Sequence, residues 1–217
     1  MASSSLQAQS ADSFEDSPVS QSEEDSAPAL EGPYAPLGGG APFGLHRGSS
    51  LEDVESLVGL LSPVSEQDYM AVQIPGSPPL LETLTLTVTP EDGLCRLRAS
   101  TALLQDPGDG SVVLDAFERL RAPLEQAFGE LHTTLDTLLP DSPYAAADQW
   151  LAGLRHRHRA LLMLWNRESG SALPDSVEHI SLAARGYSDR EGFLVLEYTF
   201  TNWSACEARR VADQAIE

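Results

Sequence analysis

The chain has 217 residues and a formal net charge of −20 at pH 7, because 33 acidic residues outnumber 13 basic ones. Such a charge repels nucleic-acid phosphates and anionic lipid surfaces, so it excludes both as partners and favours neutral or basic protein surfaces. All 13 basic residues are arginine. The absence of lysine fits a GC-rich genome best, and selection against lysine-directed modification is the alternative.

Cys95 and Cys206 are the only cysteines of the chain. Two cysteines do not make a disulfide framework at this length, so we expect buried, inert thiols in a reduced cytoplasmic or nuclear environment. The longest unbroken apolar run, residues 160–165, is too short to span a bilayer. The first residues lack the basic and apolar regions of an ordinary secretory signal.

Residues 1–48 are rich in serine, proline, glycine and acids. They cannot bury enough apolar area to offset the entropy lost on ordering, which predicts a disordered acidic arm. Ser13, Ser20 and Ser22 each precede an acid by three residues, and Ser17 precedes a proline. These patterns are typical of a phosphoprotein in a eukaryotic cell, and a solvated spacer is the simpler interpretation.

A short amphipathic helix is predicted within residues 49–79, which lead from the arm to the globular part. Ser50 can cap it, and its apolar face consists of Leu51, Val54, Leu57, Val58 and Leu61. A helix after disordered sequence is typical of segments that dock in a partner's groove, so these five residues are candidates for partner binding. The simpler alternative is that the helix packs back on the domain as its first element.

Residues 80–217 form the predicted globular domain. Leu84, Leu86 and Val88 alternate with threonines, which predicts a half-buried strand, and a turn at residues 90–93 leads to a return strand over 94–101. A second hairpin is predicted from the alternation around residues 180–184 and 194–200. A short helix is expected from about residue 204.

Two helices are predicted between these hairpins. Apolar residues at steps of three and four predict a helix from Val113 to Leu138, kinked or broken at Pro123. A second helix is predicted after Pro143, with Trp150 and Trp165 inward. We therefore expect an α+β fold in which an antiparallel sheet of two β-hairpins packs against an α-helical hairpin. Its predicted core comprises Leu84, Leu86, Val88, Phe117, Leu120, Phe128, Trp150, Leu154, Trp165, Leu194, Leu196 and Phe200.

Catalytic and cofactor motifs are missing from the sequence. It has no phosphate-binding GxxxxGK[ST] loop, no GxGxxG after a strand and no GxSxG elbow, so no catalytic residue, metal ligand or cofactor is assigned. The run at residues 106–110 resembles part of a calcium loop, but it lacks the ligand spacing and is interpreted as a turn.

Arg155, Arg157 and Arg159 alternate with two histidines and form the one dense basic patch of the chain. We place them on the second predicted helix, where histidines two residues apart point to opposite sides and cannot chelate one ion. A solvated helix face is the simpler interpretation. The alternative is a dock for an acidic partner or for the chain's own arm.

These observations predict a non-enzymatic protein-binding adaptor or regulator that contacts other proteins or a second copy of itself. Its predicted location is the cytoplasm, with the nucleus as the alternative. An enzyme is a minor alternative. With residues 69–74 as a strand, the elements run helix, three strands, helical segment, two strands, helix. This order, with the acidity, resembles the small acidic chaperones of bacterial type III secretion systems. The resemblance implies a dimer that holds an unfolded segment of an effector, and a secreted effector is a related alternative.

Overall fold

The computed structural model describes residues 32–71, 74, 76–129, 133–168 and 170–214. Over these residues the fold is α+β, as predicted, with one antiparallel sheet in the order β1-β2-β3-β4-β9-β8-β7-β6 and the short strand β5 paired with β9. The strands are β1 (Ser62–Pro63), β2 (Asp68–Ala71), β3 (Leu81–Thr89), β4 (Gly93–Thr101), β5 (Leu104–Gln105), β6 (Thr133–Leu138), β7 (Arg159–Asn166), β8 (Val177–Gly186) and β9 (Glu191–Phe200). The α-helices are α1 (Leu51–Val58), α2 (Ser111–Phe128), α3 (Trp150–Arg155) and α4 (Trp203–Gln214), and short 3₁₀ helices lie at Gly32–Leu37, Pro42–Gly44 and Ala147–Gln149.

Both predicted β-hairpins are confirmed. β3 pairs with β4, and β8 pairs with β9, and the alternating residues that we assigned to the core are buried in each strand. The two hairpins join through antiparallel pairing of β4 with β9, which places the chain's last strand in the middle of the sheet. All twelve predicted core residues are buried.

The predicted α-helical hairpin is wrong. α2 ends at Phe128 and continues through Pro123 as one helix, whereas the sequence predicted a kink or a break there. Leu135 and Leu138 lie in strand β6 instead of a helix, and the second predicted helix is reduced to the six residues of α3 followed by strand β7. Two further strands therefore extend the sheet beyond β8.

The predicted arm divides into two parts. Residues 1–31 lie outside the described residues, so its predicted disorder and its four candidate phosphorylation sites stay predictions. The rest packs against the domain, because Leu37, Phe43 and Leu45 are buried in the core. The buried Tyr198 hydroxyl donates a hydrogen bond of 2.7 Å to the Leu37 carbonyl oxygen. The boundary that we placed at residue 48 is corrected accordingly.

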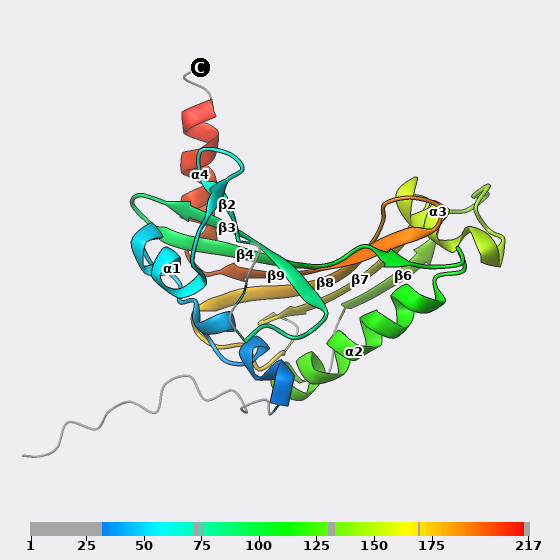
Figure 1. Ribbon diagram of the computed structural model, residues 1–217, viewed down its shortest axis with the longest axis horizontal. Helices are drawn as coiled ribbons and strands as arrows, with labels where there is room; N and C mark the ends of the chain where they lie inside the picture. The colour runs from blue at the N-terminus through cyan, green and yellow to red at the C-terminus, as the bar shows by residue number, and fades with distance from the viewer. Residues whose placement is uncertain (1–31, 72–73, 75, 130–132, 169, 215–217) are drawn as a thin grey trace, which may run out of the picture.

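The sheet has one covered and one open face. The N-terminal segment and α2 pack on the covered face, where a Cβ on Gly192 would meet the Val113 side chain at 2.9 Å. α4 lies on the opposite side at the end of the sheet formed by β2–β4, and it projects away from the strands (Figure 1). No described helix covers the rest of that second side, which we call the open face.

Candidate functional site

The open face carries a row of apolar side chains that crosses four strands. Leu135 of β6 lies opposite Leu162 of β7, Leu162 lies opposite Ala183 of β8, and Ala183 lies opposite Val195 of β9. Directly opposed residues of antiparallel strands share a face, so these four side chains stand side by side. The solvated face of an antiparallel sheet is ordinarily polar, and an apolar row on it is therefore a candidate contact surface.

A hollow of about 420 Å³ lies beside this row over β4, β9 and β8. Its lining residues are Arg98, Ser100, Ser181, Ala183, Arg185, Phe193, Val195 and Glu197. The Arg98 guanidinium donates two hydrogen bonds to one carboxylate oxygen of Glu197, at 2.9 Å from Nε and 2.5 Å from Nη2. The exposed Arg185 has no ion-pair partner among the described residues. The hollow therefore combines three apolar side chains, Ala183, Phe193 and Val195, with two serines, one neutralised positive charge and one unpaired positive charge.

The structure places the predicted partner-binding helix on the domain. α1 begins with a capping box, in which the Ser50 hydroxyl accepts a hydrogen bond from the Asp53 N–H and the Asp53 carboxylate accepts one from the Ser50 N–H. Val54 and Val58 are buried in the core. Leu61 is also buried, and Leu51 is partly buried against the core. Of the five candidate residues only Leu57 is exposed, which favours the alternative that the helix is the domain's first element.

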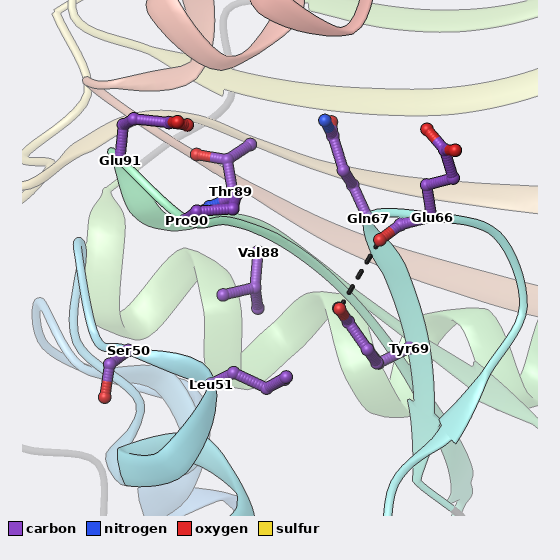
Figure 2. Close-up of a pocket in the computed structure, with 9 residues that line it drawn as sticks. All are labelled: Ser50, Leu51, Glu66, Gln67, Tyr69, Val88, Thr89, Pro90 and Glu91. Atoms are coloured by element: carbon purple, nitrogen blue, oxygen red, sulfur yellow. Dashed lines mark hydrogen bonds between the residues drawn. The ribbon is translucent and has the colours of Figure 1, made fainter. Parts of the chain in front are cut away.

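A second hollow, of about 480 Å³, lies between α1, β2 and the β3–β4 turn. Figure 2 shows Val88 above Leu51 of α1, with the side chains of Glu66 and Glu91 on the far side from Leu51. The Tyr69 hydroxyl donates a hydrogen bond of 3.4 Å to the backbone oxygen of Glu66. The hollow thus has an apolar floor and an acidic rim.

The three arginines of the predicted basic patch do not lie on one helix. Arg155 ends α3, Arg157 lies in a turn with a positive φ of 61°, and Arg159 begins β7. Arg155 pairs with Asp189 at 3.1 Å, and Arg159 lies 3.7 Å from a carboxylate oxygen of Asp136. Acids of neighbouring strands and loops therefore neutralise two of the three charges, which weakens the predicted dock for an acidic segment.

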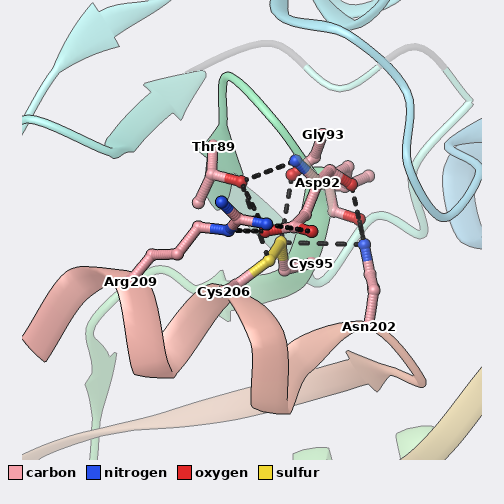
Figure 3. Close-up of polar contacts among 8 residues, drawn as sticks. Thr89, Asp92, Gly93, Cys95, Asn202, Cys206 and Arg209 are labelled. Atoms are coloured by element: carbon pink, nitrogen blue, oxygen red, sulfur yellow. Dashed lines mark hydrogen bonds and ion pairs between the residues drawn. A yellow bond between two sulfur atoms is a disulfide. The ribbon is translucent and has the colours of Figure 1, made fainter. Parts of the chain in front are cut away.

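The two cysteines, which we expected to be reduced, form a disulfide that joins β4 to α4 (Figure 3). The register explains how Cys95 reaches the helix: Thr87 pairs with Arg96 and Val88 pairs with Leu94, so Cys95 is an extra residue of β4. Such a β-bulge turns a side chain away from the face that strict alternation would give it. Both cysteines are fully buried.

Polar contacts around the disulfide hold the start of α4 over the β3–β4 turn. The Asn202 side chain donates hydrogen bonds of 2.9 and 3.1 Å to the backbone oxygens of Asp92 and Leu94. Figure 3 shows Arg209 reaching back from α4 to the Asp92 carboxylate, at 2.7 Å from Nε. The next residue, Arg210, pairs with Asp68 of β2 at 3.2 Å.

Asp68 links β2, β3 and α4. Its partial burial acts to raise the pKa of its carboxyl group, but hydrogen bonds from Thr87 and Ser65 and the charges of Arg210 and Arg96 lower that pKa below the usual 3.8. The Arg96 guanidinium in turn lies 4.4 Å from the ring centre of Trp203. This network is structural, since it joins the elements to one another and leaves no carboxylate poised over a cavity.

Within the described ranges, no three His, Cys, Asp or Glu side chains come together as metal ligands, and no helix is long and apolar enough to cross a membrane. The residue 106–110 run, interpreted from the sequence as a turn, caps α2 through Asp106. Comparison of the chain with protein-family models, curated proteins and solved structures finds no match.

Sequence reasoning missed the open face and the disulfide. The open-face residues lie on four strands, of which β6 and β7 were predicted as helix, so no local pattern placed them together. The cysteines are 111 residues apart, and only the sheet pairing and the bulge bring them into contact. The buried residues of β7, Leu161, Met163 and Trp165, alternate with Leu162 and Leu164, which are also apolar, so the sequence carried no period of two that could have identified this strand.

Proposed function

We propose that the chain is a non-enzymatic protein-binding adaptor or regulator that holds a segment of a partner protein on its open face. The observation that carries this proposal is the apolar row across β6–β9 on a sheet face that no described helix covers. A broad, shallow surface that combines an apolar row with polar side chains suits a protein segment better than a small molecule, which is ordinarily enclosed. The partner is a protein and neither a nucleic acid nor a lipid surface, because the chain's charge repels both of those.

The chemistry of the hollow defines the partner segment further. The side chains of the partner segment that face Val195 and Phe193 are apolar. One carboxylate of the segment lies against Arg185, whose charge no described acid neutralises. The Arg98–Glu197 pair is already satisfied and adds no net charge. Arg185 and the carboxylate of the segment attract each other locally, whereas the net negative charges of the chain and of an acidic partner repel each other. Added salt screens that overall repulsion, so binding to an acidic partner strengthens with salt.

The test compares two matched substitutions in affinity capture from the native cell. Val195→Glu places a charge in the apolar row, whereas Val211→Glu makes the same change on α4, where the side chain is 63% exposed. We expect the captured partner to be lost with Val195→Glu and retained with Val211→Glu. Arg185→Glu should reduce the amount of the same partner that is captured. Circular dichroism checks that each variant is folded. Equal capture by both valine variants would contradict the proposal.

The order of the elements supports a second candidate, a chaperone-like protein for a secreted partner. The predicted strand after the first helix is present as β2, and the chain runs from α1 through β1–β5 to α2, and then through β6, α3 and β7–β9 to α4. Four strands, β6–β9, stand where that class was expected to have two. A chaperone binds its partner's segment unfolded, so a synthetic peptide of the captured segment should bind as well as the whole partner. An adaptor for a folded surface should not bind that peptide.

The location of the protein stays a prediction. A cytoplasmic or nuclear home was predicted from the small number of cysteines. A buried disulfide is more typical of oxidising compartments, so the Cys95–Cys206 bond favours such a compartment or an oxidised state within the cell.

A further inference from the structure

The two edge strands of the sheet, β1 and β6, differ in whether they can pair with a further strand. At one edge, β1 has two residues and one of them is Pro63, whose missing N–H prevents further pairing. At the other edge, β6 has six residues with no proline, glycine or arginine, and it pairs with β7 in an unbroken register. Such an edge offers a row of backbone donors and acceptors to another strand.

Nothing on β6 opposes such pairing. The first five of its six residues are exposed, and the sixth, Leu138, is half-buried. Its one charge, Asp136, is paired with Arg159 of the neighbouring strand at 3.7 Å. Natural edges are commonly protected by charge, proline or a bulge, and β6 has only this neutralised carboxylate. The β6 edge is therefore open to pairing with another strand, whereas Pro63 prevents such pairing at the β1 edge.

We propose that β6 pairs antiparallel with β6 of a second copy, about a two-fold axis at Leu135. In this register Leu135 faces Leu135 of the second copy, Thr134 faces Asp136, and Thr133 faces Thr137, so apolar meets apolar and hydroxyl meets hydroxyl or carboxylate. A shift of the axis by one residue toward the C-terminus would bring Asp136 opposite its own copy, and directly opposed like charges destabilise a sheet. The strand is thus self-complementary in the register with the axis at Leu135, which alone places Leu135 opposite Leu135.

This pairing does not depend on the partner proposed above, but it changes the surface that a partner meets. A two-fold axis normal to the sheet keeps the same face upward in both copies. The apolar row Leu135, Leu162, Ala183 and Val195 then continues across the axis into the row of the second copy. The open faces of two copies form one platform, twice as wide as that of a single chain.

The first test measures mass in solution for the full chain. A contact through a single strand is small, so we expect a monomer–dimer equilibrium in the micromolar range, and salt should strengthen it by screening the −20 charge of each copy. Sedimentation at about 0.1 M and about 0.5 M salt should show more dimer at the higher salt. Leu135→Lys should abolish the dimer, whereas Leu60→Lys adds the same charge at a side chain that is 90% exposed and should leave it.

The second test reads the register. The native cysteines are bonded to each other, so an introduced cysteine is the one free thiol. Leu135→Cys should form a crosslinked dimer on mild oxidation, because directly opposed Cα atoms lie about 5 Å apart. Thr137→Cys should not, because the two Thr137 positions are offset by four residues, about 14 Å. A chain that stays monomeric at both salts, a Leu135→Lys variant that still dimerises, or equal crosslinking at both positions would each overturn the proposal.

Discussion

The carboxylate of Asp106 organises the start of α2 from a buried position. One of its oxygens accepts hydrogen bonds from the N–H groups of Gly108 and Gly110, at 2.8 and 2.9 Å, and the other accepts from Val112 and Val113, at 2.9 and 3.3 Å. The first N–H groups of a helix have no partner within it, and an anion there also meets the positive end of the helix dipole. One side chain thus satisfies both the turn and the helix that follows it.

Gly110 completes this turn because two conditions exclude other residues. Its φ is +82°, in the left-handed region that favours glycine. A Cβ at this position would lie 2.4 Å from the ring of Trp150, so the indole packs directly on the backbone. The contact ties the start of α2 to α3 on the covered face.

The residue-scale prediction is that Asp106→Asn destabilises the domain by about 3 kcal/mol, because an amide offers one acceptor oxygen and turns a donor toward backbone N–H groups. Chemical denaturation measures this loss of unfolding free energy. The matched control is Asp109→Asn, an exposed position that accepts one backbone hydrogen bond from Ser111. Its loss should be much smaller. Equal losses for the two variants would show that burial and the four hydrogen bonds of Asp106 add nothing.

At the scale of elements, the hairpins could be predicted because a period of two with polar neighbours is specific to a half-buried strand. β7 could not, because residues 160–165 are apolar without interruption, and such a run fits a buried helix and a buried strand equally. The leucines of β6 continued the helical spacing of α2, although Gly129 lies between the two elements. The leucine spacing was misleading there, because β6 forms by pairing with β7, a long-range contact that no local pattern contains.

The prediction of the site was limited by how the helices and strands pack, which the sequence does not show. The five residues of the predicted partner helix were placed correctly on a helix, but whether that helix packs on its own domain depends on the sheet that it meets. The arginine patch was assigned to a helix face, and a turn with Arg157 at positive φ stands there instead. Charge density could be read from the sequence, whereas its neutralisation by Asp136 and Asp189 required the fold.

α4 depends on few contacts. Cys206 is its one buried residue among those of the helix whose side chains are described, and Trp203 and Arg210 are half-buried. The disulfide and the ion pairs to Asp92 and Asp68 therefore hold a helix that buries little apolar surface. Ion pairs that water still reaches are individually worth about 1 kcal/mol or less, so the covalent bond is the main anchor.

The element-scale prediction is that reduction releases α4 before the sheet unfolds. Hydrogen exchange should become faster over α4 and remain slow in β8 and β9 when the disulfide is reduced, because local stability follows buried contacts. The whole domain should also lose stability, by up to about 4.7 kcal/mol for a crosslink that closes a loop of roughly a hundred residues. Cys206→Ser should behave like the reduced chain. Unchanged exchange over α4 in both would show that the non-covalent contacts suffice.

At the scale of the whole molecule, charge and core are divided unevenly along the chain. Residues 1–31 contain seven acids and no basic residue, so the net charge of residues 32–217 is −20 + 7, or −13. The segment that follows supplies Leu37, Phe43 and Leu45 to the core on the covered face. It is also tied to the end of β9, because Arg47 donates a hydrogen bond of 2.6 Å to the hydroxyl of Thr201, the residue that follows this strand. The contacts of these residues therefore place the N-terminal boundary of the domain before Leu37.

The whole-molecule prediction compares two fragments, one beginning at Gly32 and one at Ser49. The first should melt within a few degrees of the full chain, because it keeps every described contact of the core. The second should lose more than about 5 kcal/mol, or fail to fold, because it lacks three buried apolar side chains and leaves the buried Tyr198 hydroxyl without its acceptor.

Limited proteolysis of the full chain gives an independent measurement of the same boundary. The stable product should begin near residue 32, since cleavage within residues 37–45 requires that buried side chains leave the core. Leu37→Ala in the full chain should move the cut toward α1, because it removes the side chain at the site where Tyr198 holds the segment. A stable product that begins at about residue 49, melting like the full chain, would instead show that the segment contributes nothing and that the sheet and α2 form the whole domain.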